Sequence, residues 1–136
     1  MRVLIDSNVL FSAVYRLGSI PHQALLKAIK PPYQCLVCEQ SFNELYNNFS
    51  VKFPDRLDEL NIFYDTLKSL VEVIPMQKSN QITIQDIRDP DDLPILHAAV
   101  AANADFIISG DLDFLESNIT KPVIIKAAEF VKLDDQ

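Results

Sequence analysis

Acidic residues are the side chains of this sequence whose types and positions point to chemistry. The acids that stand out are Asp6, Glu44, Asp91, Asp92 and Asp111. Carboxylates held within a few ångström of one another repel unless a cation neutralises them. Mg²⁺ and Mn²⁺ suit such a cluster, because both prefer oxygen ligands. A bound cation of this kind can orient water, lower its pKa and stabilise a leaving oxyanion. The pattern therefore predicts metal-assisted chemistry on phosphate.

Short apolar runs alternate with helical patterns along the chain. The expected strands cover residues 2–5, 33–38, 71–74, 105–108 and 122–125. The expected helices cover residues 9–15, 19–30, 39–53, 54–67, 91–102 and 126–132. This alternation predicts one α/β domain over residues 1–136, built on a mainly parallel five-stranded sheet.

The expected sheet explains how distant acids could meet. Asp6 directly follows the first strand, and Asp111 follows the fourth after a Ser-Gly turn. Asp91 and Asp92 begin the helix before the fourth strand, and Glu44 lies about one turn into the helix after the second. Sites in parallel sheets form at the carboxyl ends of the strands. We therefore expect the carboxylates to gather at that edge.

Each acid also has a simpler structural explanation. Asp6 could serve as an N-cap, Glu44 as a solvated helix residue, Asp91 and Asp92 as acids suited to a helix start, and Asp111 as a turn former. Capping and metal binding do not exclude one another, so these explanations leave the predicted site open.

Length and composition limit the class of protein. The chain has 136 residues, of which 49% are hydrophobic and 23% charged, a balance typical of one globular domain. No apolar run is long enough for a membrane span. The apolar run at residues 3–5 is too short for the core of a signal peptide, so we expect a cytoplasmic protein.

Cysteine and glycine usage excludes other kinds of site. Cys35 and Cys38 lie on an expected strand, where residues three apart face opposite sides, so we expect buried free thiols. Gly18 and Gly110 are the two glycines of the chain, which excludes a glycine-rich phosphate loop.

Charge is unevenly distributed along the chain. The net charge is −7, which by itself argues against a nucleic-acid-binding protein that relies on positive charge to contact the phosphate backbone. Arg88 is the one Lys or Arg between residues 86 and 113. The same stretch contains seven Asp, at positions 86, 89, 91, 92, 105, 111 and 113. Cations bound there would reverse the local sign and allow nucleic acid to approach.

Four segments together resemble the PIN domain family, and in particular the VapC-like toxins of toxin–antitoxin systems. The segments are Val3–Leu10, Glu44, Asp89–Asp92 and Ser109–Phe114. They occur in the order and at the separations of the family, and the resemblance covers nearly the whole chain. It implies a three-layer α/β/α sandwich.

The resemblance also implies the residues of a site. Its catalytic set would be Asp6, Glu44, Asp92 and Asp111; its metal ligands Asp6, Asp92, Asp111 and Asp113; and its supporting groups Asn8, Asp91 and Ser109. In many relatives the third acid lies slightly nearer the following helix, where this chain has Leu93-Pro94. Asp92 is the preferred candidate for that acid, and Asp91 is the alternative.

The implied activity is a Mg²⁺- or Mn²⁺-dependent endoribonuclease that hydrolyses RNA, with an antitoxin as its partner, homodimer formation and no membrane association. Apolar surface on the first four helices could form a dimer face or an antitoxin groove. Basic residues that could line an RNA path are Arg16, Lys27, Lys30 and Lys52.

Two other functions compete with this one. A receiver-like phosphoacceptor domain also holds Mg²⁺ at the carboxyl edge of a parallel sheet, but it needs two adjacent acids after the first strand, where this chain has Asp6 alone. A catalytically inactive PIN-like scaffold would bind RNA or protein without cleaving it, and the Leu93-Pro94 departure favours it.

Overall fold

A five-stranded parallel sheet forms the centre of the protein. The computed structural model describes residues 1–76, 93–110 and 121–133. The strands are β1 (Arg2–Ile5), β2 (Gln34–Cys38), β3 (Glu72–Ile74), β4 (Phe106–Ile108) and β5 (Val123–Ile125). Their order is β3-β2-β1-β4-β5, and every pairing is parallel. The predicted strands are confirmed, and each of the last four begins one residue later than expected.

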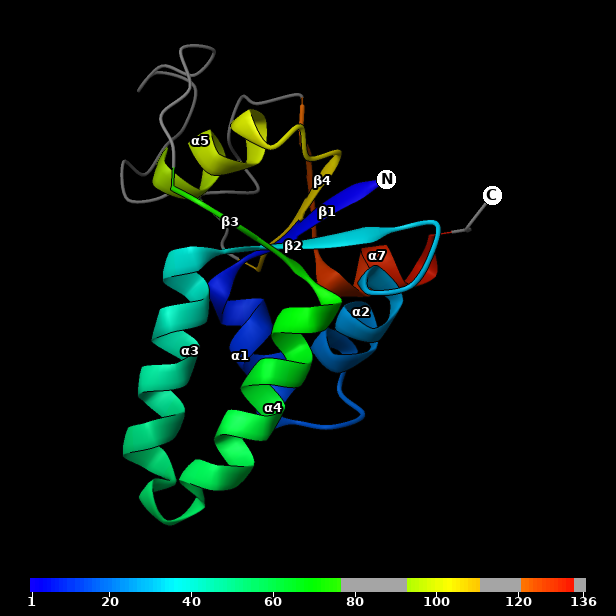
Figure 1. Ribbon diagram of the computed structural model, residues 1–136. Helices are drawn as coiled ribbons and strands as arrows, with labels where there is room; N and C mark the ends of the chain where they lie inside the picture. The colour runs from blue at the N-terminus through cyan, green and yellow to red at the C-terminus, as the bar shows by residue number, and fades with distance from the viewer. Residues whose placement is uncertain (77–92, 111–120, 134–136) are drawn as a thin grey trace.

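Helices cover both faces of the sheet (Figure 1). They are α1 (Ser7–Tyr15), α2 (Ile20–Ala28), α3 (Glu39–Lys52), α4 (Leu57–Leu70), α5 (Leu93–Ala101) and α7 (Ala127–Lys132), with a 3-10 turn, η1 (Pro54–Arg56), before α4. One hydrophobic cluster packs α1, α2, α3, α4 and α7 against one face, and a second packs α5 against the other. The expected three-layer α/β/α arrangement is confirmed.

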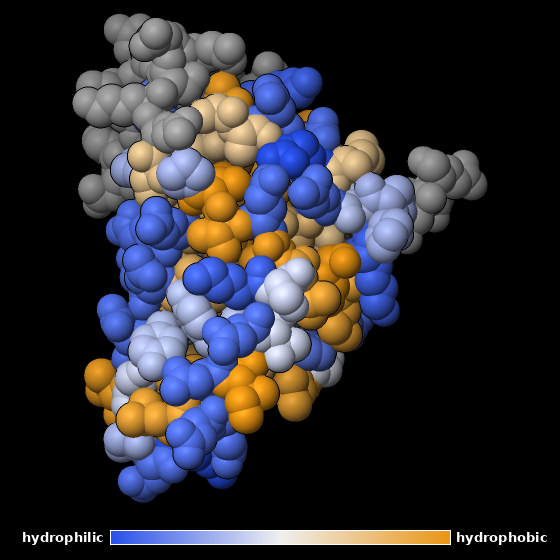
Figure 2. Space-filling view, in the orientation of Figure 1, coloured by the Kyte–Doolittle hydropathy of each residue, from blue (hydrophilic) through white to orange (hydrophobic). Residues whose placement is uncertain are grey.

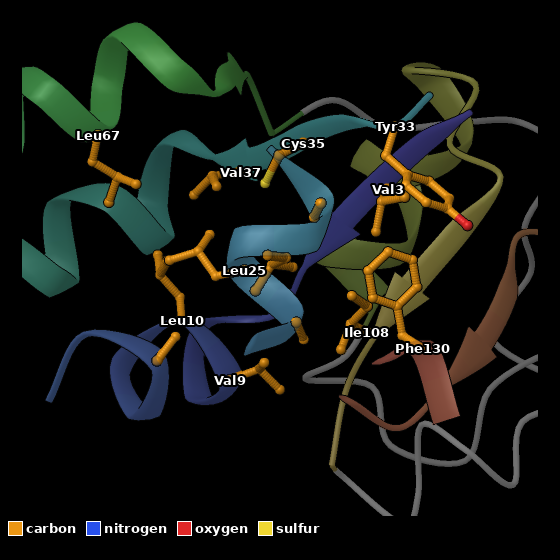
Figure 3. Close-up of a cluster of buried hydrophobic side chains, with 14 of the residues drawn as sticks. Val3, Val9, Leu10, Leu25, Tyr33, Cys35, Val37, Leu67, Ile108 and Phe130 are labelled. Atoms are coloured by element: carbon orange, nitrogen blue, oxygen red, sulfur yellow. The ribbon is translucent and has the colours of Figure 1, made fainter. Parts of the chain in front are cut away.

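The central strands are apolar on both faces, as buried parallel strands require. Val3 and Ile5 of β1 point into the larger cluster, whose side chains Figure 3 shows, and Leu4 points into the smaller one. The cysteines follow the same alternation, with Cys35 in the larger cluster and Cys38 in the smaller. Full burial of an aliphatic side chain contributes about 1.5–3 kcal/mol, so these strands anchor both halves of the core.

Polar residues set the helix starts. Ser19 caps α2 by accepting a hydrogen bond of 3.3 Å from the backbone N–H of His22, with Pro21 in the first turn. Helix α1 begins at Ser7, two residues earlier than expected, because the Asp6 side chain caps it.

Helix α4 carries an apolar stripe that the core covers on one side. Its apolar stripe is only partly buried: Leu60 and Leu67 lie in the core, whereas Leu57 is 44% exposed and Phe63 is 40% exposed. The strand and helices beneath α4 cover one side of this stripe, and the rest of it remains on the surface.

A network at the amino edge of the sheet fixes the strands at the end opposite to Asp6. The Arg2 guanidinium donates to the carbonyl of Ala102, to Gln34 and to Glu72, at 2.7, 3.1 and 2.5 Å. The Asp105 carboxylate accepts a hydrogen bond of 2.8 Å from the backbone N–H of Arg2. Asp105 thus has a structural role, at the end of the sheet opposite to Asp6.

The surface over the upper part of α3 is largely hydrophilic on the face shown in Figure 2. Hydrophobic side chains also reach the surface, and the most exposed of them are Val51, Leu17 and Ile62. In the described part of the chain, none of the helices has the length and apolar character needed to cross a membrane.

Candidate active site

Asp6 lies where β1 ends, next to the end of β4. The parallel register pairs Ile5 with Ile108, which brings Asp6 beside Ser109. The Ser109 hydroxyl donates a hydrogen bond of 3.0 Å to Asp6 Oδ2, and the backbone N–H of Ser7 donates one of 2.8 Å to Asp6 Oδ1. The backbone N–H of Asp6 donates to the carbonyl of Ile108 at 3.0 Å. The carboxylate is therefore held by two strands that are about a hundred residues apart in the chain.

Burial makes this carboxylate unusual. Asp6 is 8% exposed and Ser109 is fully buried. A buried carboxylate is costly unless hydrogen bonds or opposite charge compensate for its lost hydration. The hydroxyl, the backbone N–H and the amino end of the α1 dipole all favour its negative charge. The fold therefore holds one carboxylate rigidly at the carboxyl edge of the sheet.

Cys38, at the end of β2, is a second group near Asp6. Burial, and to a lesser extent the charge of Asp6, raises the pKa of the Cys38 thiol from 9.0 to about 12. Burial alone raises the pKa of Cys35 to about 12. Both cysteines are free and buried, as the sequence predicts. Both thiols stay protonated near neutral pH in the protein itself.

A pair of hydroxyls joins the start of α1 to the first turn of α3. Ser7 Oγ and Ser41 Oγ are 2.5 Å apart, and Ser41 is buried. Both serines line a cavity of about 220 Å³ together with Glu44 of α3 and Pro94 of α5. The hydroxyl pair thus fixes α3, and with it Glu44, relative to the start of α1.

The Glu44 side chain lies at the junction of two hollows on the surface of α3. It is partly buried, its Oε1 accepts a hydrogen bond of 3.2 Å from Gln40 one turn earlier, and it lines both the 220 Å³ cavity and a neighbouring hollow. Glu44 therefore shares a cavity with Ser7, the residue that follows Asp6.

Other predicted site residues lie outside the residues that the structure describes. They are Asp91, Asp92, Asp111 and Asp113. Within the described residues, no three His, Cys, Asp or Glu side chains form a group that could hold a metal. Asn8 is exposed on α1, and no hydrogen bond to Asp6 or Ser109 is seen for it in this part of the chain.

Some residues at this edge were not singled out from the sequence. Ser7, Ser41 and Gln40 contact the predicted site residues or line their cavity. Ser7 directly follows Asp6, but nothing in the sequence pairs it with Ser41, because the contact requires the strand order. Gln40 could have been predicted to contact Glu44, because side chains four residues apart on a helix are neighbours.

One basic residue of the expected RNA path has a structural role. Lys27 Nζ donates to the carbonyls of Phe130 and Leu133 at the end of α7, at 2.8 and 2.5 Å, and lies 5.1 Å from the centre of the Phe130 ring. The Lys27 charge therefore serves the packing of α2 on α7.

The available donors fit a hard divalent cation. The Asp6 carboxylate lies beside the Ser109 hydroxyl, and the Glu44 carboxylate shares a cavity with the hydroxyls of Ser7 and Ser41. Oxygen-only donor sets with retained water are typical of Mg²⁺ and Mn²⁺.

Comparison with known proteins identifies the family. The family model of the PIN domain matches residues 2–113. No curated protein matches the sequence. The fold is similar to a chain of the crystal structure of VapBC2 from Rickettsia felis bound to a DNA fragment from their promoter, with a TM-score of 0.64 and 17% sequence identity, covering 93% of this chain and 98% of that chain. At this identity the structural match shows a common fold. Because the family model spans most of the sequence, including Asp6, Glu44 and Ser109, the chain belongs to the PIN domain family.

Proposed function

We propose that the protein is a metal-dependent endoribonuclease that hydrolyses RNA phosphodiester bonds. The observation that carries this proposal is the buried Asp6 carboxylate, held by Ser109 and by the start of α1 at the carboxyl edge of the sheet. Membership of the PIN domain family, whose members are typically nucleases, supports it.

We assign each of the candidate residues a role in this reaction. Asp6, Asp92 and Asp111 would hold Mg²⁺ or Mn²⁺, with Asp113 as an outer ligand and Asp91 as the alternative to Asp92. Glu44 would act from α3 at the cavity that it lines with Ser7 and Ser41, and the hydrogen bond from Gln40 would orient it. Ser109 would fix the orientation of Asp6. The cation would supply activation of the attacking water and stabilisation of the leaving oxyanion.

The test is cleavage of single-stranded RNA by the purified protein in Mg²⁺ and in a chelator. We expect cleavage in Mg²⁺ alone, and a rate that Asp6→Asn lowers by more than about 100-fold, since loss of a partner of a metal ligand already costs 10–100-fold. Asp58→Asn removes an exposed carboxylate of α4 and is the matched control. RNA cut equally well in chelator, or by Asp6→Asn, would contradict the proposal.

Direct metal binding distinguishes a ribonuclease from an inactive scaffold. Calorimetric titration with Mn²⁺ should show binding to the wild type and none to the Asp6→Asn/Asp111→Asn variant. Binding of RNA without metal and without cleavage would favour the scaffold instead. Stable acyl-phosphate formation from a small phosphodonor would favour the receiver-like alternative.

We further propose that the protein is the toxin of a toxin–antitoxin pair. The similar chain comes from the structure of VapBC2 bound to promoter DNA, which supports a partner protein. A hollow of about 450 Å³ between α1, α3 and α4 is lined mainly by apolar side chains, among them Leu17, Phe53 and Phe63. An apolar segment of an antitoxin fits this surface.

The partner proposal is tested by co-purification with the product of an adjacent small reading frame. Leu17→Asp should weaken the complex, because Leu17 is 81% exposed and lines the hollow. Val51→Asp is the matched control, because Val51 is 83% exposed and does not line it. Equal recovery of both variants in the complex would place the partner elsewhere. Sedimentation of the free protein tests the homodimer that the family resemblance implies.

A further inference from the structure

Three adjoining hollows form a groove along α3 that begins at the candidate active site. The first, of about 220 Å³, is the cavity at Ser41 and Glu44. The second, of about 510 Å³, shares Gln40 and Glu44 with the first, and the third, of about 400 Å³, shares Asn43 and Asn47 with the second. We call this surface the α3 groove, defined by Ser41, Gln40, Glu44, Asn43, Asn47 and Tyr64. It leads away from the site that would hold the scissile phosphate.

Two asparagines present amide groups to the middle of the groove. Asn43 and Asn47 are exposed and lie four residues apart on α3, so their side chains share one face of the helix. An asparagine amide offers two N–H donors and one acceptor oxygen in a plane. This pattern matches the edges of unpaired bases, which carry both donors and acceptors.

Aromatic rings form the far wall of the groove. The Tyr64 ring packs edge-on against Phe42, with ring centres 4.7 Å apart, and against Tyr46 at 5.1 Å. The Tyr46 hydroxyl donates a hydrogen bond of 2.9 Å to Asn61 Oδ1. These contacts fix the rings before any ligand arrives. A rigid aromatic wall beside amides suits a planar base, because bases of single strands commonly pack on aromatic side chains.

The charge of the groove selects bases over phosphates. Glu39 and Glu44 line it, and neither Lys nor Arg of the described chain does so. Lys68 approaches the far end, with Nζ 5.9 Å from the centre of the Tyr64 ring. A phosphate backbone would be repelled along most of this surface, whereas an uncharged base would not.

We propose that the α3 groove binds bases of single-stranded RNA next to the scissile phosphodiester and gives the enzyme its base preference; this inference rests on the proposed ribonuclease function. Asn43 and Asn47 read the base edges, and Tyr46 and Tyr64 bound the space for the ring. The bound base lies on the α3 side of the cut, and the phosphate lies at Asp6.

The test compares the products of a random library of short single-stranded RNAs. Wild type should cut with a base preference next to the cleavage site. Asn43→Ala/Asn47→Ala should cut with a flattened preference and with a kcat/KM lowered about tenfold, mainly through KM, as loss of two hydrogen bonds predicts. Asn48→Ala is the matched control, since Asn48 is an exposed asparagine of the same helix outside the groove, and it should behave as wild type.

The outcomes separate the two proposals. If the double variant keeps the wild-type base preference and KM, the groove does not read bases, and the ribonuclease function stands. If wild type leaves the library intact, the ribonuclease function fails. Fluorescence anisotropy with the same RNAs then decides the groove: equal affinities of wild type and double variant overturn it, and a loss of about tenfold confined to the double variant retains it as an RNA-binding surface.

Discussion

Ser109 Oγ donates a hydrogen bond of 3.0 Å to Asp6 Oδ2 and thereby joins the end of β4 to the end of β1. Both residues are buried, and they are 103 positions apart in the sequence. The contact exists because β4 pairs directly with β1 in parallel register. It gives the proposed metal ligand a fixed orientation, so the catalytic proposal depends on this link between two strands.

Ser109→Ala should weaken both stability and metal binding. Removing the hydroxyl leaves a buried carboxylate with one donor fewer, at a cost of about 1–3 kcal/mol in the free energy of unfolding. Urea unfolding measures this cost, and Mn²⁺ titration together with RNA cleavage measures the functional loss. Ser69→Ala, on the exposed surface of α4, should stay within about 0.5 kcal/mol of wild type. A Ser109→Ala variant with unchanged stability and metal affinity would show that Asp6 does not need this hydroxyl.

The Ser7–Ser41 hydroxyl pair should show energetic coupling. Each single alanine variant leaves the other hydroxyl without its partner, and the double variant removes both, so the double variant should lose less than the sum of the singles. We expect a coupling energy of about 0.5–1.5 kcal/mol from a double-mutant cycle in urea. Strict additivity would mean that the pair does not hold α1 against α3. RNA cleavage should fall in both single variants, because the position of Glu44 depends on α3.

Stability should decrease above about pH 9, and Cys35 should account for part of this decrease. Its thiol has a pKa of about 12 in the folded protein against 9.0 for the ordinary group. The unfolded chain therefore loses this proton first as the pH rises, which favours unfolding between these values. For this one group, the linkage between proton binding and folding lowers the free energy of unfolding by about 1.4 kcal/mol between about pH 8 and about pH 10.

Cys35→Val isolates that contribution, because valine is uncharged at every pH. The variant should lose less stability than wild type over the same pH interval, as measured by urea midpoints at both ends. Identical pH dependence in the two proteins would contradict the prediction, since every other titrating group is common to both.

Lys27→Met should destabilise the packing of α7. The ammonium group donates to carbonyls of Phe130, Val131 and Leu133, and methionine keeps the apolar stem without these bonds. We expect a loss of about 1.5–3 kcal/mol, together with faster proteolysis near the end of α7. Lys30→Met is the control, since Lys30 is exposed just beyond α2. Equal stability of the two variants would show that Lys27 does not hold α7.

The strands, most helices and the carboxylate after β1 could be predicted from the sequence because local patterns encode them. The short apolar runs of β1 and β2 bury both faces, and Ser19 with Pro21 marks the start of α2 through hydrogen bonding and backbone geometry within one turn. The alternation of side chains along a strand likewise predicted that Cys35 and Cys38 face opposite sides. The position of Asp6 at a strand end follows from the same local reasoning.

Tertiary structure decided which of these local features meet. The strand order β3-β2-β1-β4-β5 brings Ser109 to Asp6, and the packing of α3 beside α1 brings Ser41 to Ser7. It also decided that Leu57 and Phe63 remain exposed, because the space beneath α4 admits only part of its apolar stripe. A sequence pattern reports what a residue favours within its own helix or strand. Contacts between distant segments depend on which elements become neighbours, and that choice is made by burial and hydrogen bonding over the whole fold.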